Sequence, residues 1–165
     1  IVNGIDSSYY GVSTVGAALR RSKYENGGDF PEFLLKLTLK AFRKTYGQDP
    51  FDLIIYVPPT ESGDLVKNFA EKLSSVLKVP ISHSLIKTAE TQPQKVFKNG
   101  YLKRDNVLHK FEYSNPNEIQ DKNIILFDDI FDSGATIKEI GNVLTRLGAS
   151  KIAPLVIART VGGDI

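Results

Sequence analysis

The sequence contains no cysteine, no methionine and no tryptophan, and its only histidines are His83 and His109. Without cysteine the chain forms no disulfide and offers no thiolate to a metal, and two well-separated histidines argue against a zinc site. No apolar run approaches the roughly 18 residues that a membrane-spanning helix needs, and no secretory signal pattern opens the chain. We therefore expect a cytoplasmic protein with no membrane partner.

The absence of methionine extends to position 1, which is Ile1. Natural chains begin with methionine unless they are processed, so we expect one domain, residues 1–165, excised from a longer chain. The length and the 41% of hydrophobic residues suit a single domain with a real core. A net charge of +2 argues against a polycation built to bind nucleic acid.

Strands and helices alternate along most of the chain. Helical spacing of apolar residues occurs at 31–46, 65–77 and 137–147, and short apolar runs typical of strands occur at 53–57, 79–85, 124–128 and 152–158. This alternation predicts an α/β fold with a mainly parallel sheet flanked by helices. Ligands of such sheets bind at the carboxyl ends of the strands.

Two segments resist this classification. Residues 1–30 are hard to classify: Tyr9-Tyr10-Gly11 and the run 12–19 are compatible with a short strand or hairpin, and a break follows at 26–29. Residues 87–120 are polar and lack a steady period. So long a connection is either a functional lid or flexible loop, or it holds short strands of its own.

The segment 124–136 carries the most information. A buried strand delivers the acidic pair, Asp128 and Asp129, and a loop containing Gly134 then opens a helix. Unpaired backbone N–H groups and the positive end of the helix dipole suit a phosphate there. Carboxylates just upstream suit sugar hydroxyls or a hydrated magnesium ion. The alternative is an ordinary strand–turn–helix with a solvated acidic pair.

At these residues the chain resembles the type I phosphoribosyltransferases, whose signature is four apolar residues, two acids, an apolar residue, a short gap and Gly-x-Thr. The resemblance implies that fold, with a small variable N-terminal hood, and a ligand that is phosphoribosyl pyrophosphate or a ribose 5-phosphate compound. It places Asp128 and Asp129 on the ribose hydroxyls and on Mg²⁺. It places the 5′-phosphate in what we call the phosphate loop: Asp132, Ser133, Gly134, Ala135 and Thr136.

The turn between the first strand and the next helix is a second candidate anion site. In the family a loop at this place contacts pyrophosphate, and here it comprises Pro59, Thr60, Glu61, Ser62 and Gly63. It has no lysine or arginine, so its grip would come from backbone N–H groups and hydroxyls. The alternative is a helix cap and turn without a ligand.

Basic residues dominate 87–110. A basic lid would neutralise a departing pyrophosphate and exclude water, and we expect Lys95 or Arg104 to hold that leaving group. The alternative is a solvated basic loop, or one that touches nucleic acid.

Within and after this segment, Thr91-Gln92-Pro93-Gln94, Arg104-Asp105-Asn106-Val107 and Phe111 resemble the ComF branch of the family. The resemblance covers 53–159. The chain departs from that branch in lacking its cysteine-rich zinc module and its Arg-Gly-Phe-Asn-Gln segment, which puts a ComF-like role in DNA uptake in doubt. The last two thirds also resemble phosphoribosyltransferase-like domains appended to RecQ-type helicases.

Asp132 has two interpretations. Purine-using members of the family carry an aspartate at this place, facing the base, where it exchanges a proton with a ring nitrogen. Equally, an aspartate before Ser-Gly caps the following helix.

The resemblance therefore implies an enzyme that transfers a phosphoribosyl group to a nucleobase or amine, with Asp132, Lys95 and Arg104 in catalytic roles. The rival is a non-catalytic sensing or interaction module, fused to a RecQ-type helicase or another DNA-processing domain. A homodimer is a further open arrangement. A Rossmann dinucleotide site is disfavoured because no Gly-x-Gly-x-x-Gly follows the first strand.

Overall fold

The computed structural model describes residues 13–25, 28–47, 49–59, 63–88 and 110–160. Its centre is a four-stranded sheet in the order β2-β1-β5-β6, with every neighbouring pair parallel. The strands are β1 (Leu53–Tyr56), β2 (Ile81–Ser82), β5 (Asn123–Phe131) and β6 (Lys151–Arg159). The predicted α/β fold with a mainly parallel sheet is confirmed.

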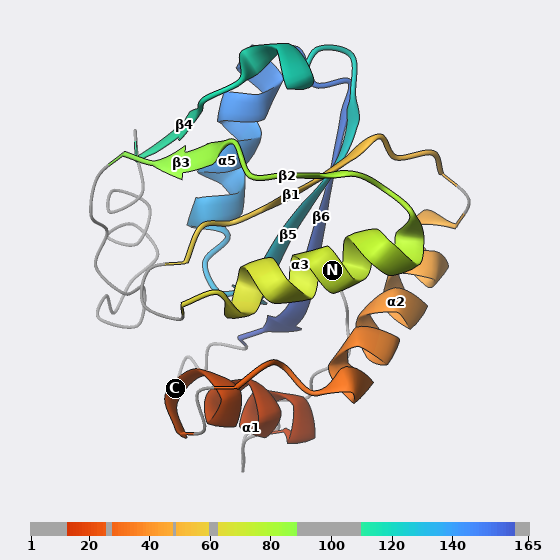
Figure 1. Cartoon of the computed structure of the whole chain (residues 1–165), viewed down its shortest axis with the longest axis vertical. Coiled ribbons are helices and arrows are strands. Elements are labelled where there is room, and N and C mark those ends of the chain that lie inside the picture. Colours follow the sequence, from red (N-terminus) through yellow and green to blue (C-terminus); the bar gives the residue numbers. More distant parts are fainter. Residues whose placement is uncertain (1–12, 26–27, 48, 60–62, 89–109, 161–165) are drawn as a thin grey trace.

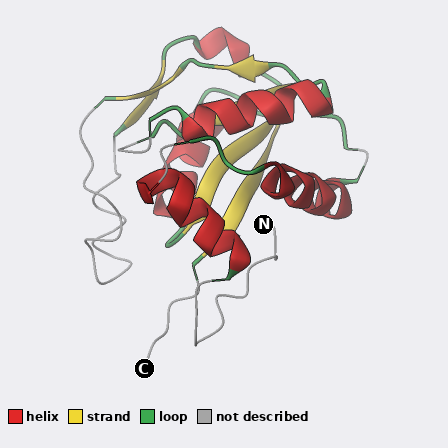
Figure 2. Cartoon of the chain, turned by 60° about the horizontal axis from the view of Figure 1, so that its bottom comes forward, coloured by secondary structure: helices red, strands yellow, loops and turns green. Residues whose placement is uncertain are grey.

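The central strand β5 is buried on both faces, which explains its unbroken apolar run. Its side chains alternate between two hydrophobic clusters. Ile125 and Phe127 pack in the cluster that contains α2 (Glu32–Tyr46) and α3 (Leu65–Leu77), whereas Ile124 and Leu126 pack in the one that contains α5 (Ala135–Arg146). In Figures 1 and 2 the strands accordingly lie between helices.

The three predicted helices are confirmed, and glycines end two of them. Gly47 follows α2 at φ 59° and Gly148 follows α5 at φ 86°, a region that favours glycine. Phe69 of α3 stacks on Phe127 with ring centroids 5.3 Å apart, which fixes α3 against the central strand. Among the described residues no helix has both the length and the apolar character needed to cross a bilayer.

The expected strand or hairpin at 12–19 is wrong, because the described part of that run is helical. Helix α1 (Thr14–Arg20) continues into the π-helical turn η1 (Arg21–Glu25). The Ser13 side chain accepts the N–H of Gly16 at 3.1 Å and so caps α1. Figure 1 shows α1 beside the arrowhead of β6, at the end of the sheet where ligands of this fold class bind.

The single strand expected at 79–85 is also wrong. It divides at His83 and Ser84 into β2 and β3 (Leu85–Lys87), and β3 pairs antiparallel with β4 (Phe111–Tyr113) in a separate two-stranded sheet. The polar segment 87–120 therefore contains a strand of its own and a 3-10 turn, η3 (Pro116–Glu118). Its middle, 89–109, lies outside the described residues.

Candidate functional site

The acidic pair lies within β5 rather than after it, because the strand runs on to Phe131. Asp128 is in register with Val156 of β6, which holds the backbone of the pair rigidly. Asp129 is only 5% exposed, and Asp128 is partly buried. The interpretation of a freely solvated acidic pair therefore fails for these two side chains.

A lysine from the N-terminal segment reaches this pair. The ammonium of Lys23, in η1, forms an ion pair with Oδ2 of Asp129, and the two side chains are 14% and 7% exposed. Within the described residues this oxygen is buried and accepts no well-aligned hydrogen bond, so the ion pair is its main partner there. Asp129 thus retains the capacity to accept hydrogen bonds from a ligand.

The other carboxyl group is held in an unfavourable environment for its charge. Burial, and then the neighbouring charge of Asp129, raise the pKa of Asp128 well above its usual range. The N–H of Asp129 donates to Oδ1 of Asp128 at 2.8 Å, and Lys23 partly offsets the repulsion. A cation or hydroxyl donors from a ligand would relieve the remaining strain between the two carboxylates.

The phosphate loop follows directly. Gly134 adopts φ 75°, and α5 begins at the next residue, so that backbone N–H groups of the first turn face the loop. The Ser133 hydroxyl accepts the N–H of Ala135 at 3.3 Å, and the backbone N–H of Lys138 donates to the carbonyl of Gly134 at 2.9 Å, the first hydrogen bond of the helix. Strand, loop and helix N-terminus are arranged as the sequence predicts.

Asp132 is linked to the end of the last strand. The hydroxyl of Thr160 donates to Oδ1 of Asp132 at 2.6 Å, and the N–H of Thr160 donates to the carbonyl of Phe131 at 2.9 Å. These bonds fasten the start of the phosphate loop to the residue after β6. The residue at the cap position of α5 is Gly134, so Asp132 is not the N-cap residue, and its role in proton exchange stays a prediction.

The remaining predicted site residues are only partly described. Pro59 follows β1, and Gly63 adopts φ 55° just before α3. Thr60, Glu61 and Ser62 lie outside the described residues, as do Lys95 and Arg104. The structure therefore brings together the acidic pair and the phosphate loop, and it adds Lys23, which the sequence analysis missed.

A signal for the helix that precedes Lys23 was present in the sequence. Ser13 precedes Val15, Ala18, Leu19 and Ser22, which are buried at helical spacing. No local pattern, however, pairs Lys23 with a carboxylate on a distant strand.

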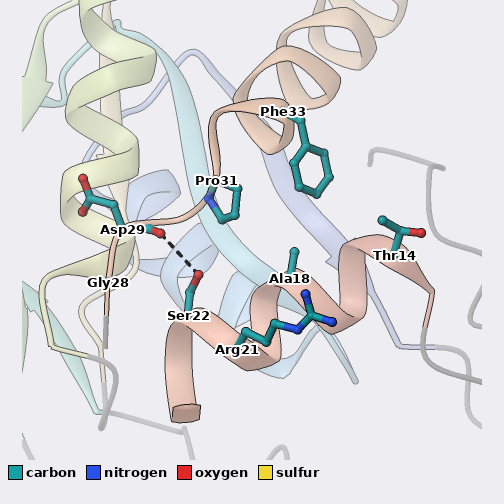
Figure 3. Close-up of a pocket in the computed structure, with 8 residues that line it drawn as sticks. All are labelled: Thr14, Ala18, Arg21, Ser22, Gly28, Asp29, Pro31 and Phe33. Atoms are coloured by element: carbon teal, nitrogen blue, oxygen red, sulfur yellow. Dashed lines mark hydrogen bonds between the residues drawn. The ribbon is translucent and has the colours of Figure 1, made fainter. Parts of the chain in front are cut away.

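A described pocket in this region is separate from the acidic pair. It has a volume of about 290 Å³ and lies between the α1–η1 segment and the start of α2. Figure 3 shows Ala18 and Arg21 on one side of it and Pro31 and Phe33 on the other. None of the site residues predicted from the sequence lines it, so we do not assign the predicted ligand to this pocket.

A magnesium ion fits the residues at the acidic pair if a ligand supplies part of its coordination shell. Within the described part of the chain, no group of three or more His, Cys, Asp or Glu side chains gathers to hold a metal. Mg²⁺ is commonly held by one or two carboxylates, with water and substrate phosphates completing its shell. Asp128 and Asp129 therefore suit a magnesium ion that arrives with a phosphorylated ligand.

Comparison with known proteins agrees with this geometry. The family model described as "Phosphoribosyl transferase domain" matches residues 67–161, which include the acidic pair and the phosphate loop. A relative of known sequence is the DNA utilization protein YhgH of Escherichia coli O157:H7, 28% identical over 137 residues. The match covers 78% of this chain but only 58% of YhgH, so the chain spans little more than half the length of that relative.

Solved structures share the fold at low sequence identity. A purine phosphoribosyltransferase from Pyrococcus horikoshii superimposes with a TM-score of 0.51 at 17% identity, covering 80% of this chain and 77% of that one. Adenine phosphoribosyltransferase from Saccharomyces cerevisiae gives 0.53 at 16%, with coverages of 79% and 71%. The glutamine phosphoribosylpyrophosphate amidotransferase of B. subtilis gives 0.51 at 19%, covering 75% of this chain and 26% of that one.

The family match extends over more than half of the chain, and the strand, acidic pair, glycine loop and helix form one continuous unit in the structure. This chain belongs to the phosphoribosyl transferase domain family, as a type I, ComF-like member.

Proposed function

We propose that this domain binds phosphoribosyl pyrophosphate, or a related ribose 5-phosphate ligand, together with Mg²⁺. One observation carries the proposal. The acidic pair, with Asp129 buried and Asp128 partly buried, and the glycine loop that opens α5 belong to one continuous segment, so hydroxyl acceptors and phosphate donors lie side by side. A ribose 5-phosphate presents the complementary groups in the same order.

The chain's own residues divide the ligand between them. Asp128 and Asp129 accept hydrogen bonds from the ribose hydroxyls. Backbone N–H groups of the phosphate loop, with the hydroxyls of Ser133 and Thr136, hold the 5′-phosphate. Residues 59–63, with Lys95 or Arg104, hold the pyrophosphate.

Transfer, if the domain is an enzyme, replaces pyrophosphate at the ribose C1 by a nucleobase or amine nitrogen. The C1–O bond breaks and the C1–N bond forms through a cation-like transition state, and the nitrogen releases a proton. Asp132, held by Thr160, takes that proton. Bound magnesium would neutralise charge on the departing pyrophosphate.

Calorimetric titration tests the proposal. We would titrate the domain with phosphoribosyl pyrophosphate and with ribose 5-phosphate, each with and without Mg²⁺. We expect saturable binding of both, strengthened by Mg²⁺ for the pyrophosphate compound. No heat of binding for either ligand at millimolar concentration would contradict the proposal.

A second candidate is a non-catalytic sensing or interaction module of a DNA-processing protein, including a RecQ-type helicase or ComF-like protein. The likeness to a protein described as a DNA utilization protein favours it. The two candidates differ in turnover. We would assay pyrophosphate release in the presence of a panel of nucleobases and amines. Release with any of these acceptors supports transfer, whereas binding of phosphoribosyl pyrophosphate without release supports the sensing module.

A further inference from the structure

The ion pair between Lys23 and Asp129 is more buried than the other ion pairs among the described residues. The side chains of Lys23 and Asp129 are 14% and 7% exposed, whereas those of Lys36 and Glu32 on α2 are 73% and 77% exposed. Removing two charges from water is costly, and a buried pair is therefore weak support for stability by itself. A function at the acidic pair gives a better reason for the lysine.

The segment that carries Lys23 is anchored through the preceding residue, Ser22. The Ser22 hydroxyl donates to the carbonyl of Asp29 at 3.3 Å, drawn as a dashed line in Figure 3. The carboxylate of Asp29 in turn accepts bonds from Asn68 at 3.0 Å and Lys72 at 2.7 Å, both on α3. Lys23 itself lies in a π-helical turn, a distortion that is frequent at functional sites.

The ammonium lies where a metal would bind. Its Nζ is in direct contact with Oδ2 of Asp129, the oxygen that has no other aligned donor within the described residues. A divalent cation coordinated by the same oxygen would lie close to the ammonium, and the two positive charges would repel each other in a poorly solvated place. Ammonium and metal therefore exclude one another at this oxygen.

We propose that Lys23 is the resident counter-cation of the acidic pair and competes with a divalent metal for Asp129. The free protein then binds metal weakly, and Mg²⁺ enters together with a phosphorylated ligand whose hydroxyls and phosphates displace the ammonium. This inference rests on the proposed function for the identity of that ligand. The test described next uses metal alone and does not depend on the proposed function.

Titration with Mn²⁺, followed by loss of the electron paramagnetic resonance signal of the free ion, measures the competition. We expect Lys23→Met to bind Mn²⁺ about tenfold or more tightly than the wild type, because the repelling charge is gone. Lys23→Arg keeps that charge and should bind as weakly as the wild type. Lys36→Met removes an exposed lysine and serves as the matched control.

Two results would contradict the role of Lys23. Lys23→Met binding Mn²⁺ no more tightly than the wild type would overturn it, and so would tight binding that survives Asp129→Asn in the Lys23→Met background. Thermal unfolding checks that each variant is folded, and Lys23→Gln, which retains a hydrogen-bond donor, replaces Lys23→Met if that variant does not fold. Tighter Mn²⁺ binding without any affinity for phosphoribosyl pyrophosphate would support the role of Lys23 and contradict the proposed function.

Discussion

Gly134 lies against the far edge of the Phe131 ring. A Cβ atom built on Gly134 would be 2.6 Å from Cζ of that ring, closer than two carbon atoms can approach without one of them moving. Gly134 also has φ 75°, a backbone conformation that other residues adopt only with strain. The phosphate loop therefore depends on glycine for two separate reasons, even before a ligand enters.

We expect Gly134→Ala to lower the free energy of unfolding by at least about 1–2 kcal/mol, from backbone strain alone. Urea denaturation measures the loss. Gly141→Ala is the control, since Gly141 lies inside α5 with nothing within 4 Å of a built Cβ, and alanine favours a helix there. Equal stability of the two variants would contradict this account of the loop.

Ligand binding by Gly134→Val tests the phosphate assignment. A branched side chain would fill the loop, so we expect no detectable binding of ribose 5-phosphate to a variant that circular dichroism shows to be folded. Phe131→Leu combined with Gly134→Val relieves the contact with the ring and should still not bind. Wild-type affinity in either variant would contradict the placement of the phosphate.

The part of this site that could be predicted from sequence is the part made by one continuous segment. Four consecutive apolar residues, Ile124 to Phe127, are buried because both faces of β5 are covered, and the loop and helix follow immediately. The three helices α2, α3 and α5 could be predicted because each buries one face, which gives its apolar residues helical spacing. Local pattern and tertiary packing agree along this stretch.

The parts that could not be predicted depend on contacts between distant segments. The strand expected at 79–85 divides because Leu85 pairs with Tyr113 of β4. The sequence around Leu85 contains no pattern that predicts this distant pairing. The run 12–19 contains valine and glycine, which have low helix propensity, so the local pattern does not predict a helix. The short helix is stabilised by the Ser13 cap and by packing against the core. Lys23 meets Asp129 only because α1 folds over the end of β5.

The raised pKa of Asp128 makes stability depend on pH. Its folded-state pKa lies above the unfolded value near 3.8, so the folded state binds the proton more tightly. The favourable contribution of this carboxyl is complete below pH 3.8 and is lost as the pH rises through the raised pKa. We expect Asp128→Asn to gain stability relative to the wild type as the pH increases from 4 towards neutrality. A difference in melting temperature that stays constant over that range would contradict this.

Glu118 fastens the second sheet to the end of β2. Its Oε2 accepts the hydroxyls of Ser82 at 2.6 Å and Tyr113 at 2.9 Å. Tyr113 is buried, and that burial raises its pKa to about 12. We expect Tyr113→Phe to cost about 1 kcal/mol of stability, the usual net value of a lost hydrogen bond, as measured by denaturant titration. No loss would mean that water replaces the tyrosine hydroxyl.

The same network gives a pH dependence of opposite sign. Hydrogen bonds, first from Ser82, lower the pKa of Glu118 below its usual 4.5. Its contribution is therefore present above pH 4.5 and is lost as the pH falls through the lowered pKa. We expect Glu118→Gln to be destabilised most near neutral pH and to approach the wild type in acid, with exposed Glu112→Gln as the control. A larger deficit in acid would contradict the sign.

Substitution of Asp132 distinguishes an effect on the rate of transfer from an effect on ligand affinity. If it accepts the proton of the incoming nitrogen, Asp132→Asn should lower the rate of pyrophosphate release about 100-fold or more, while the affinity for phosphoribosyl pyrophosphate changes little. Thr160→Val, which removes the donor to Asp132, should slow release less than Asp132→Asn does. Loss of affinity in proportion to loss of rate would assign Asp132 to the structure of the phosphate loop instead.

The most direct test of the whole account is a calorimetric titration of the Asp128→Asn, Asp129→Asn double variant with phosphoribosyl pyrophosphate and Mg²⁺, beside the wild type. Both substitutions preserve side-chain shape, and thermal unfolding confirms the fold. We expect magnesium-dependent binding to the wild type and none to the double variant. Equal affinity of the two proteins would show that the acidic pair does not hold the ligand and would contradict the central claim.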